Sequence, residues 1–155
     1  MTKTELYQQT VRRLADLLSG ETDFIANAAN TAAVLFGSLP DVSWAGVYVN
    51  RDGELVLGPF QGPPACTRIP FGTGVCGTAA AERRTVVVPD VRRFPGHIAC
   101  QPDSRSEIVV PICVDGKVAG VLDLDSPVLG RFDADDQMGL EHAVAIFLRN
   151  TAIPG

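Results

Sequence analysis

The chain has 155 residues, of which 46% are hydrophobic and 20% charged, a balance typical of one compact domain rather than a disordered chain or an array of small modules. Its 13 Lys and Arg against 18 Asp and Glu give a formal charge of -5, which disfavours a nucleic-acid backbone as the partner. Because no apolar run approaches the ~20 residues of a membrane span and residues 1–5 lack the apolar core of a signal peptide, we expect a soluble, cytoplasmic protein.

The first 60 residues contain two predicted helices and a hairpin. Apolar residues recur at helical spacing over residues 4–18 and again over residues 23–38, so each segment can turn an apolar stripe toward a core. From residue 42 to residue 60 the period changes to two, with turn residues at positions 50–53. This pattern predicts two antiparallel strands.

The middle of the chain is predicted to be more irregular. Short strands are expected over residues 68–71 and 85–88, separated by the glycine-punctuated residues 72–77 and one helical turn at residues 78–82. Residues 89–106 contain three prolines and are predicted to form a long loop. Loops of that length inside a compact domain are usually functional or disordered.

The last third contains a second hairpin and a helix. Residues 107–114 and 117–124 are apolar and flank Asp115-Gly116, the strongest hairpin signal in the chain. Asp133 is a good N-cap for a final helix because further acids follow it in the first turn. Since hairpins dominate, we expect an α+β fold with a mostly antiparallel sheet and helices packed on it.

The four cysteines divide into three plus one. Cys66, Cys76 and Cys100 lie in turn-rich segments, where partial exposure lets solutes reach a thiolate. Cys113 lies in the apolar run 108–114, and a free cysteine there usually packs as a small inert hydrophobe. Four cysteines are too few for a disulfide scaffold in a chain of this size, so packing, metal binding or catalysis is expected.

Two kinds of chemistry compete for the loop cysteines. Zinc would use His97, three residues before Cys100, but the gaps between successive loop cysteines are 10 and 24 residues and no C-x-x-C pair is present, which disfavours it. Redox or nucleophilic chemistry at Cys100 is favoured because nearby cations stabilise a thiolate. The nearby cations are five arginines within a stretch of 23 residues, which also contains two aspartates: Arg83, Arg84, Arg92, Arg93 and Arg105. An ordinary surface loop in which these arginines only contact solvent remains an equal alternative.

Three carboxyl groups are predicted to gather at one end of the second hairpin. Asp123 and Asp125 are two residues apart in a predicted strand, so their side chains share a face. Counting back from the Asp115-Gly116 turn places Glu107 opposite about Leu124, where it can lie beside both aspartates. Gathered carboxyl groups repel, which raises at least one pKa and lets that group donate a proton. An Asp-Ser-Pro turn is the competing interpretation for either aspartate alone.

Trp44 and Tyr48 share a strand face across Gly46, whose missing side chain leaves a gap between two large rings. This arrangement can form the apolar wall of a small-molecule pocket. Taken alone, the single Trp of a small domain is more often part of the core, so the core interpretation is favoured.

Eight segments together resemble the GAF-domain free methionine-(R)-sulfoxide reductases. Ordinary GAF sensor domains share the fold pattern but lack the constellation of three cysteines, so the resemblance is specific. The segments cover nearly the whole chain and are Gly58–Gly62, Ala65–Cys66, Ile69–Gly72, Gly74–Ala79, Val88–Val91, Phe94–Cys100, Ser104–Pro111 and Gly120–Pro127.

The resemblance implies one GAF-like catalytic domain over residues 1–155, with about six antiparallel strands flanked by helices. By position, Cys100 is implied to be the nucleophile, Cys66 its resolving partner, and Cys76 a further member of the disulfide relay. The implied activity is that of an oxidoreductase, the reduction of free L-methionine (R)-sulfoxide to L-methionine, with thioredoxin restoring the thiols. A homodimer is also implied.

The same resemblance assigns the remaining site residues. Glu107, Asp123 and Asp125 are implied to hold the sulfoxide oxygen and the substrate amino group, and Trp44 and Tyr48 to surround the methyl end. No metal and no organic cofactor are implied. The alternative is a GAF module that binds a small ligand or senses oxidation without turnover; with no effector domain in the sequence, the enzyme is favoured.

Overall fold

The computed structural model describes residues 1–98 and 100–154, so Ala99, within one of the segments that carry the resemblance, lies outside the described residues. The elements in chain order are α1 (Lys3–Leu18), α2 (Phe24–Ser38), β1 (Trp44–Arg51), β2 (Glu54–Gln61), β3 (Arg68–Pro70), α3 (Gly74–Glu82), β4 (Val86–Val88), the 3-10 helix η1 (Val91–Arg93), β5 (Ser106–Val114), β6 (Lys117–Ser126) and α4 (Ala134–Asn150).

The six strands form one sheet in the order β3-β2-β1-β6-β5-β4, and every neighbouring pair is antiparallel. The predicted α+β class and antiparallel sheet are therefore confirmed. Both hairpins turn where predicted, because Asp52-Gly53 and Asp115-Gly116 adopt the positive φ angles that a two-residue turn requires.

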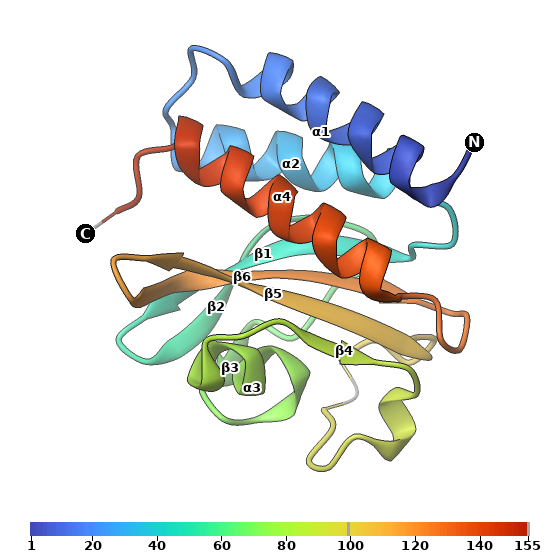
Figure 1. Cartoon of the computed structure of the whole chain (residues 1–155). Helices are drawn as coiled ribbons and strands as arrows, with labels where there is room; N and C mark the ends of the chain where they lie inside the picture. The colour runs from blue at the N-terminus through green and yellow to red at the C-terminus, as the bar shows by residue number, and fades with distance from the viewer. Residues whose placement is uncertain (99, 155) are drawn as a thin grey trace.

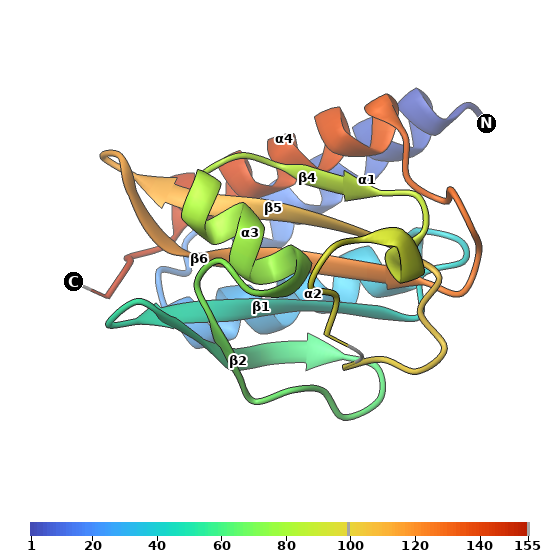
Figure 2. The ribbon, with the colours of Figure 1, turned by 90° about the horizontal axis from the view of Figure 1, so that it is seen from below.

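The sheet separates two layers of different character. Helices α1, α2 and α4 cover one face (Figure 1), whereas α3 and the segment between β4 and β5 cover the other (Figure 2). Side chains that alternate along each strand contribute to both layers. Leu122 and Leu124 of β6 pack against the three helices, and Val121 packs on the α3 side. Because Asp123 and Asp125 follow the alternation of Val121, they belong to the α3 face.

Helix α3 starts four residues earlier than predicted, at Gly74 instead of Thr78. Glycines at this point suggested a turn, but here they permit close packing. A Cβ on Gly77 would lie 2.5 Å from the carbonyl oxygen of Pro70, so only glycine lets the helix lie this close to the end of β3. The Gly72 N–H donates a hydrogen bond to the Gly77 carbonyl at 2.8 Å, and this bond also holds α3 close to the end of β3.

The N-terminus of α4 is fastened to α1 through a buried carboxylate. Asp133 caps α4 as predicted, accepting from the backbone N–H of Asp136. Asp136 is fully buried and accepts from Tyr7 Oη at 2.7 Å, Lys3 Nζ at 2.8 Å and Arg131 at 3.1 Å. Two cations and a phenol therefore compensate the burial of this charge. Among the helices in the described part of the chain, none is both long and apolar enough to cross a membrane.

Candidate functional site

The three predicted carboxyl groups do meet on the α3 face, but in a different register from the one expected. Glu107 pairs with Asp125 instead of Leu124, because the register of β5 and β6 shifts by one residue at Ile112 and Cys113. Directly paired residues of antiparallel strands point to the same side of a sheet. Without this bulge Glu107 would face the helices with Leu124, so the irregularity brings the carboxyl groups together.

All three carboxyl groups are buried: Glu107 is 7% exposed, Asp123 5% and Asp125 3%. Burial raises the pKa of each, and for Asp123 the charges of Asp125 and Glu107 raise it further. Ser104 donates to Asp125 at 3.1 Å. The other oxygen of Asp125 and one oxygen of Asp123 are buried without a hydrogen-bond partner among the described residues. The cluster is therefore suited to donate a proton and to receive a positively charged group.

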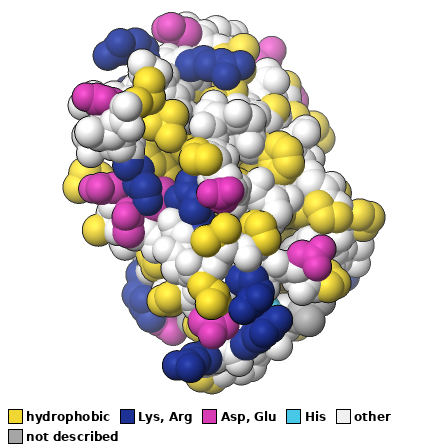
Figure 3. All heavy atoms as spheres, turned by 90° about the vertical axis from the view of Figure 1, so that its right-hand side faces the viewer, with side chains coloured by type: hydrophobic (Ala, Val, Ile, Leu, Met, Phe, Trp, Pro, Cys, Tyr) yellow, Lys and Arg dark blue, Asp and Glu magenta, His cyan; other side chains and the backbone are white. Residues whose placement is uncertain are grey.

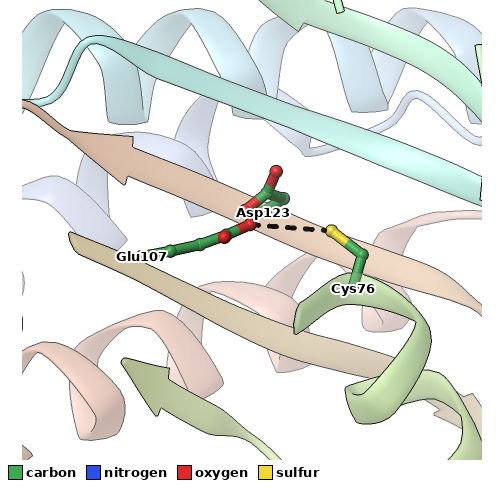
Figure 4. Close-up of side chains that lie close together, drawn as sticks. All are labelled: Cys76, Glu107 and Asp123. Atoms are coloured by element: carbon green, nitrogen blue, oxygen red, sulfur yellow. Dashed lines mark hydrogen bonds between the residues drawn. The ribbon is translucent and has the colours of Figure 1, made fainter. Parts of the chain in front are cut away.

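Cys76 contradicts the prediction that it lies in a partly exposed turn. It lies in α3, is 4% exposed, and directs its Sγ at Glu107 Oε2 across 3.8 Å (Figure 4). Burial, followed by the charges of Asp123 and Glu107, raises the pKa of the thiol well above its usual range. Cys76 is thus a protonated thiol at neutral pH and not a ready nucleophile.

Cys66 and Cys100 form a disulfide, with Cα atoms 5.2 Å apart. Both are half-buried and come from the loop after β2 and the segment between β4 and β5. The bond occupies two of the sulfurs on which the zinc alternative depends. Cys113 is a free cysteine that packs, half-buried, against the α3-side core, which agrees with its predicted packing role.

Three of the five arginines near Cys100 in sequence have polar partners elsewhere, Arg83 with the Gly116 carbonyl, Arg84 with Glu82 and Arg93 with Asp90. Among the described residues lining the cavity beside Cys100 there is no Arg or Lys. Arg83 also lies close enough to Cys113 to lower its pKa against the larger effect of burial. On the face drawn in Figure 3, basic and acidic side chains are both present, and two basic side chains lie next to each other at the lower right.

Trp44 and Tyr48 form a wall of this cavity and also hold the loop that carries Cys66. Their rings stack 5.9 Å apart, and Phe60 stacks on Trp44 at 5.2 Å. Trp44 Nε1 donates to the Pro63 carbonyl at 3.0 Å, and Tyr48 Oη donates to the Cys66 carbonyl at 2.9 Å. Trp44 and Tyr48 are each 1% exposed and both line the cavity, so they belong to the core and to the pocket wall at the same time.

The cavity between these groups is small, with a volume of about 30 Å³. Its lining brings together every predicted site residue except Cys66. It adds Ser104, Gln101 and Ile98, which the sequence analysis did not single out. His97, considered only as a zinc ligand, also lines it. Ser104 could have been found from its place two residues before the β5 strand that carries Glu107, but nothing in the pattern marked Ile98.

The comparisons with known proteins agree with this geometry. Residues 4–149 match the family model described as GAF domain. The free methionine-R-sulfoxide reductase of Escherichia coli (strain K12) is 52% identical over 145 residues, covering 94% of this chain and 88% of that protein. Protein YtsP of Bacillus subtilis (strain 168) is 58% identical over 137 residues, covering 87% and 84%.

This chain belongs to the GAF-domain free methionine-R-sulfoxide reductases. Among solved structures, the free methionine-R-sulfoxide reductase of Neisseria meningitidis in complex with its substrate superposes with a TM-score of 0.93 at 49% identity, covering 97% of this chain and 90% of that one. The family suggested by the sequence is confirmed, and the fold of the reductases extends over nearly the whole chain.

Proposed function

We propose that the protein is an oxidoreductase that reduces free L-methionine (R)-sulfoxide to L-methionine as one catalytic domain. The observation that carries this proposal is the Cys66–Cys100 disulfide beside a cluster of buried carboxyl groups. An oxidised thiol pair next to proton donors is what a sulfoxide reductase contains after turnover. The relatives named for this activity support the choice of substrate.

In the first step the Cys100 thiolate attacks the sulfur of the substrate. A sulfoxide oxygen leaves poorly unless it is protonated, and a neutral carboxyl group supplies that proton. Glu107, Asp123 and Asp125 are candidates because burial favours their neutral forms. Oxygen passes from the substrate to Cys100, methionine leaves, and Cys100 becomes a sulfenic acid.

In the second step the Cys66 thiol condenses with the sulfenic acid, forming the disulfide and releasing water. Cys66 is the resolving thiol in this proposal because it is the partner already bonded to Cys100. Cys76 would enter the relay only by later thiol–disulfide exchange. An external dithiol, which we propose to be thioredoxin, reduces the disulfide and completes the cycle.

Specificity for the free amino acid follows from the same carboxyl groups. While one of them is neutral, an ionised neighbour pairs with the substrate ammonium, a charge that a residue within a peptide lacks. The stacked rings of Trp44 and Tyr48 offer an apolar surface to the methyl end. Acetylating the substrate nitrogen should therefore reduce kcat/KM at least as strongly as removing one charge-assisted hydrogen bond, about tenfold or more.

We place this cycle in the cytoplasm, where thioredoxin keeps thiols reduced, and we propose a homodimer as the assembled form. The groove between α1 and α4, which includes the 71%-exposed Met138, is the surface that supports a homodimer. Light scattering coupled to size exclusion measures the mass and so tests the dimer.

The test of the activity is methionine release from the separate R and S epimers of free methionine sulfoxide with a small dithiol. We expect turnover of the R epimer only. Cys100→Ser should abolish it, and Cys66→Ser should retain activity with the small dithiol but lose it with thioredoxin. Cys113→Ser is the matched control and should behave like the wild type. Binding of the R epimer without turnover would instead favour the sensor module.

A further inference from the structure

Cys76, Glu107 and Asp123 form a compact set of three buried groups whose ligand atoms lie within 4.8 Å of one another. Figure 4 shows the thiol of α3 and the carboxyl groups of β5 and β6 converging on one point. We propose that this set binds one thiophilic divalent cation of the Zn²⁺ class. The ion would bind to carboxyl groups that the proposed reaction needs, so it would inhibit that reaction. The inhibition rests on the proposed function, whereas the binding of the ion does not.

The distances suit such an ion. Cys76 Sγ and Glu107 Oε2 are 3.8 Å apart. Zinc binds sulfur at about 2.3 Å and carboxylate oxygen at about 2.0–2.2 Å, and the sum of the two bonds exceeds this separation. One ion can therefore contact both atoms without moving β5 or α3. In binding it displaces to solvent the thiol proton and the proton of any ligand carboxyl group that is neutral, and it forms metal–sulfur and metal–oxygen bonds with no change of oxidation state.

Unpartnered acceptors provide an independent indication of a cationic ligand. One oxygen of Asp123 and one of Asp125 are buried without a hydrogen-bond partner among the described residues, although both side chains line the cavity. Buried oxygens without donors are costly, and a cation satisfies them. The set supplies one sulfur and two carboxylate oxygens, and a water molecule can take the fourth position of four-coordinate zinc.

Size and ligand type decide which ion fits. The cavity of about 30 Å³ has the volume of about one water molecule. It is large enough to accept one ion in the disulfide form. The thiolate favours Zn²⁺, and Mg²⁺ and Ca²⁺ prefer sites made entirely of oxygen. We therefore expect Zn²⁺ and Co²⁺ to bind and Mg²⁺ to be excluded.

The test uses the full chain in its disulfide form, in which Cys76 and Cys113 are the free cysteines. Titration with Co²⁺ should produce a sulfur-to-cobalt charge-transfer absorption that saturates at one ion per chain and disappears when Zn²⁺ is added. Cys76→Ser should remove this absorption, and Cys113→Ser should leave it unchanged. Zinc affinity measured by calorimetry should fall in Cys76→Ser by more than the roughly 10- to 100-fold typical of losing a group that only supports a ligand.

A second variant keeps the test decisive. If Cys76→Ser does not fold, Asp123→Asn should weaken zinc binding while Asp52→Asn, an exposed acid on the β1–β2 turn, does not. Loss of the absorption in Cys113→Ser, or absence of any cobalt absorption in the wild type, overturns the site. Turnover of the R epimer is measured separately in chelator, so a failed titration with intact turnover refutes the metal site alone. Metal binding without turnover refutes the proposed function alone.

Discussion

Substituting Gly46 should disturb both the stability and the substrate pocket. A Cβ built on Gly46 lies 2.4 Å from Phe60 Cβ and 2.6 Å from the edge of the Trp44 ring, well inside the contact distance of carbon atoms. Gly46→Ala must therefore displace the stacked rings, and overpacking of this kind costs about 1–3 kcal/mol. For a chain of this length each kcal/mol lowers Tm by about 2–4 °C, so a drop of about 2–12 °C is expected.

Activity should fall with stability, because the displaced ring is the wall of the cavity. Misplacement by about 1 Å can lower the rate about 100-fold, and we expect kcat/KM to fall by about 10- to 100-fold. The matched control is Gly37→Ala on the exposed side of α2, where a Cβ meets nothing within 4 Å and should stabilise the helix by about 0.5–1 kcal/mol. A Gly46→Ala protein with the wild-type Tm and kcat/KM would show that the rings do not fill this space.

Three further predictions concern charge and redox state. Burial raises the folded-state pKa of Asp123. The contribution of this one group to stability is therefore most favourable below its unfolded pKa of about 3.9, and it is lost as pH rises through the folded pKa. Asp123→Asn should thus raise Tm more at pH 8 than at pH 5 while lowering activity, and an equal shift at both pH values contradicts this. Asp136→Ala leaves the nearly buried Arg131 without its carboxylate partner and should cost about 3–5 kcal/mol in urea unfolding. Asp16→Ala, at an exposed position, should change stability by no more than about 0.5 kcal/mol. The Cys66–Cys100 bond spans a sequence separation of 34, so a dithiol should lower the unfolding free energy by up to about 4 kcal/mol, and it should not change that of Cys66→Ser.

Much of the fold follows from local signals in the sequence. Asp52-Gly53 and Asp115-Gly116 favour positive φ angles, which determine both hairpins, and Asp133 caps α4 through its own side chain. Alternation places Trp44 and Tyr48 on one face of β1 and Asp123 and Asp125 on one face of β6. These features depend on neighbours within a few residues, and for that reason they could be predicted.

The parts that failed depend on contacts between distant segments. Helix α3 begins at Gly74, in a glycine-rich segment that is typical of turns, because glycine allows this helix to pack closely on β3. The helix buries Cys76. Arg84 and Arg93, which are close to Cys100 in sequence, pair with Glu82 and Asp90, contacts that the sequence did not indicate. The resemblance, rather than spacing, indicated that Cys66 and Cys100 act together.

Because of the bulge in the second hairpin, the number of residues in β6 determines which side of the sheet Glu107 faces. Gly120 pairs with Ile112 and Val118 with Cys113, so Ala119 is the unpaired residue. Deleting Ala119 would restore a regular ladder and exchange the two faces of β5 relative to β6: Glu107 would turn toward the helical core, and Ile108 would turn toward the cavity. In this hairpin a one-residue deletion changes the strand register and removes an acid from the site, although every residue that forms the site is still present in the chain.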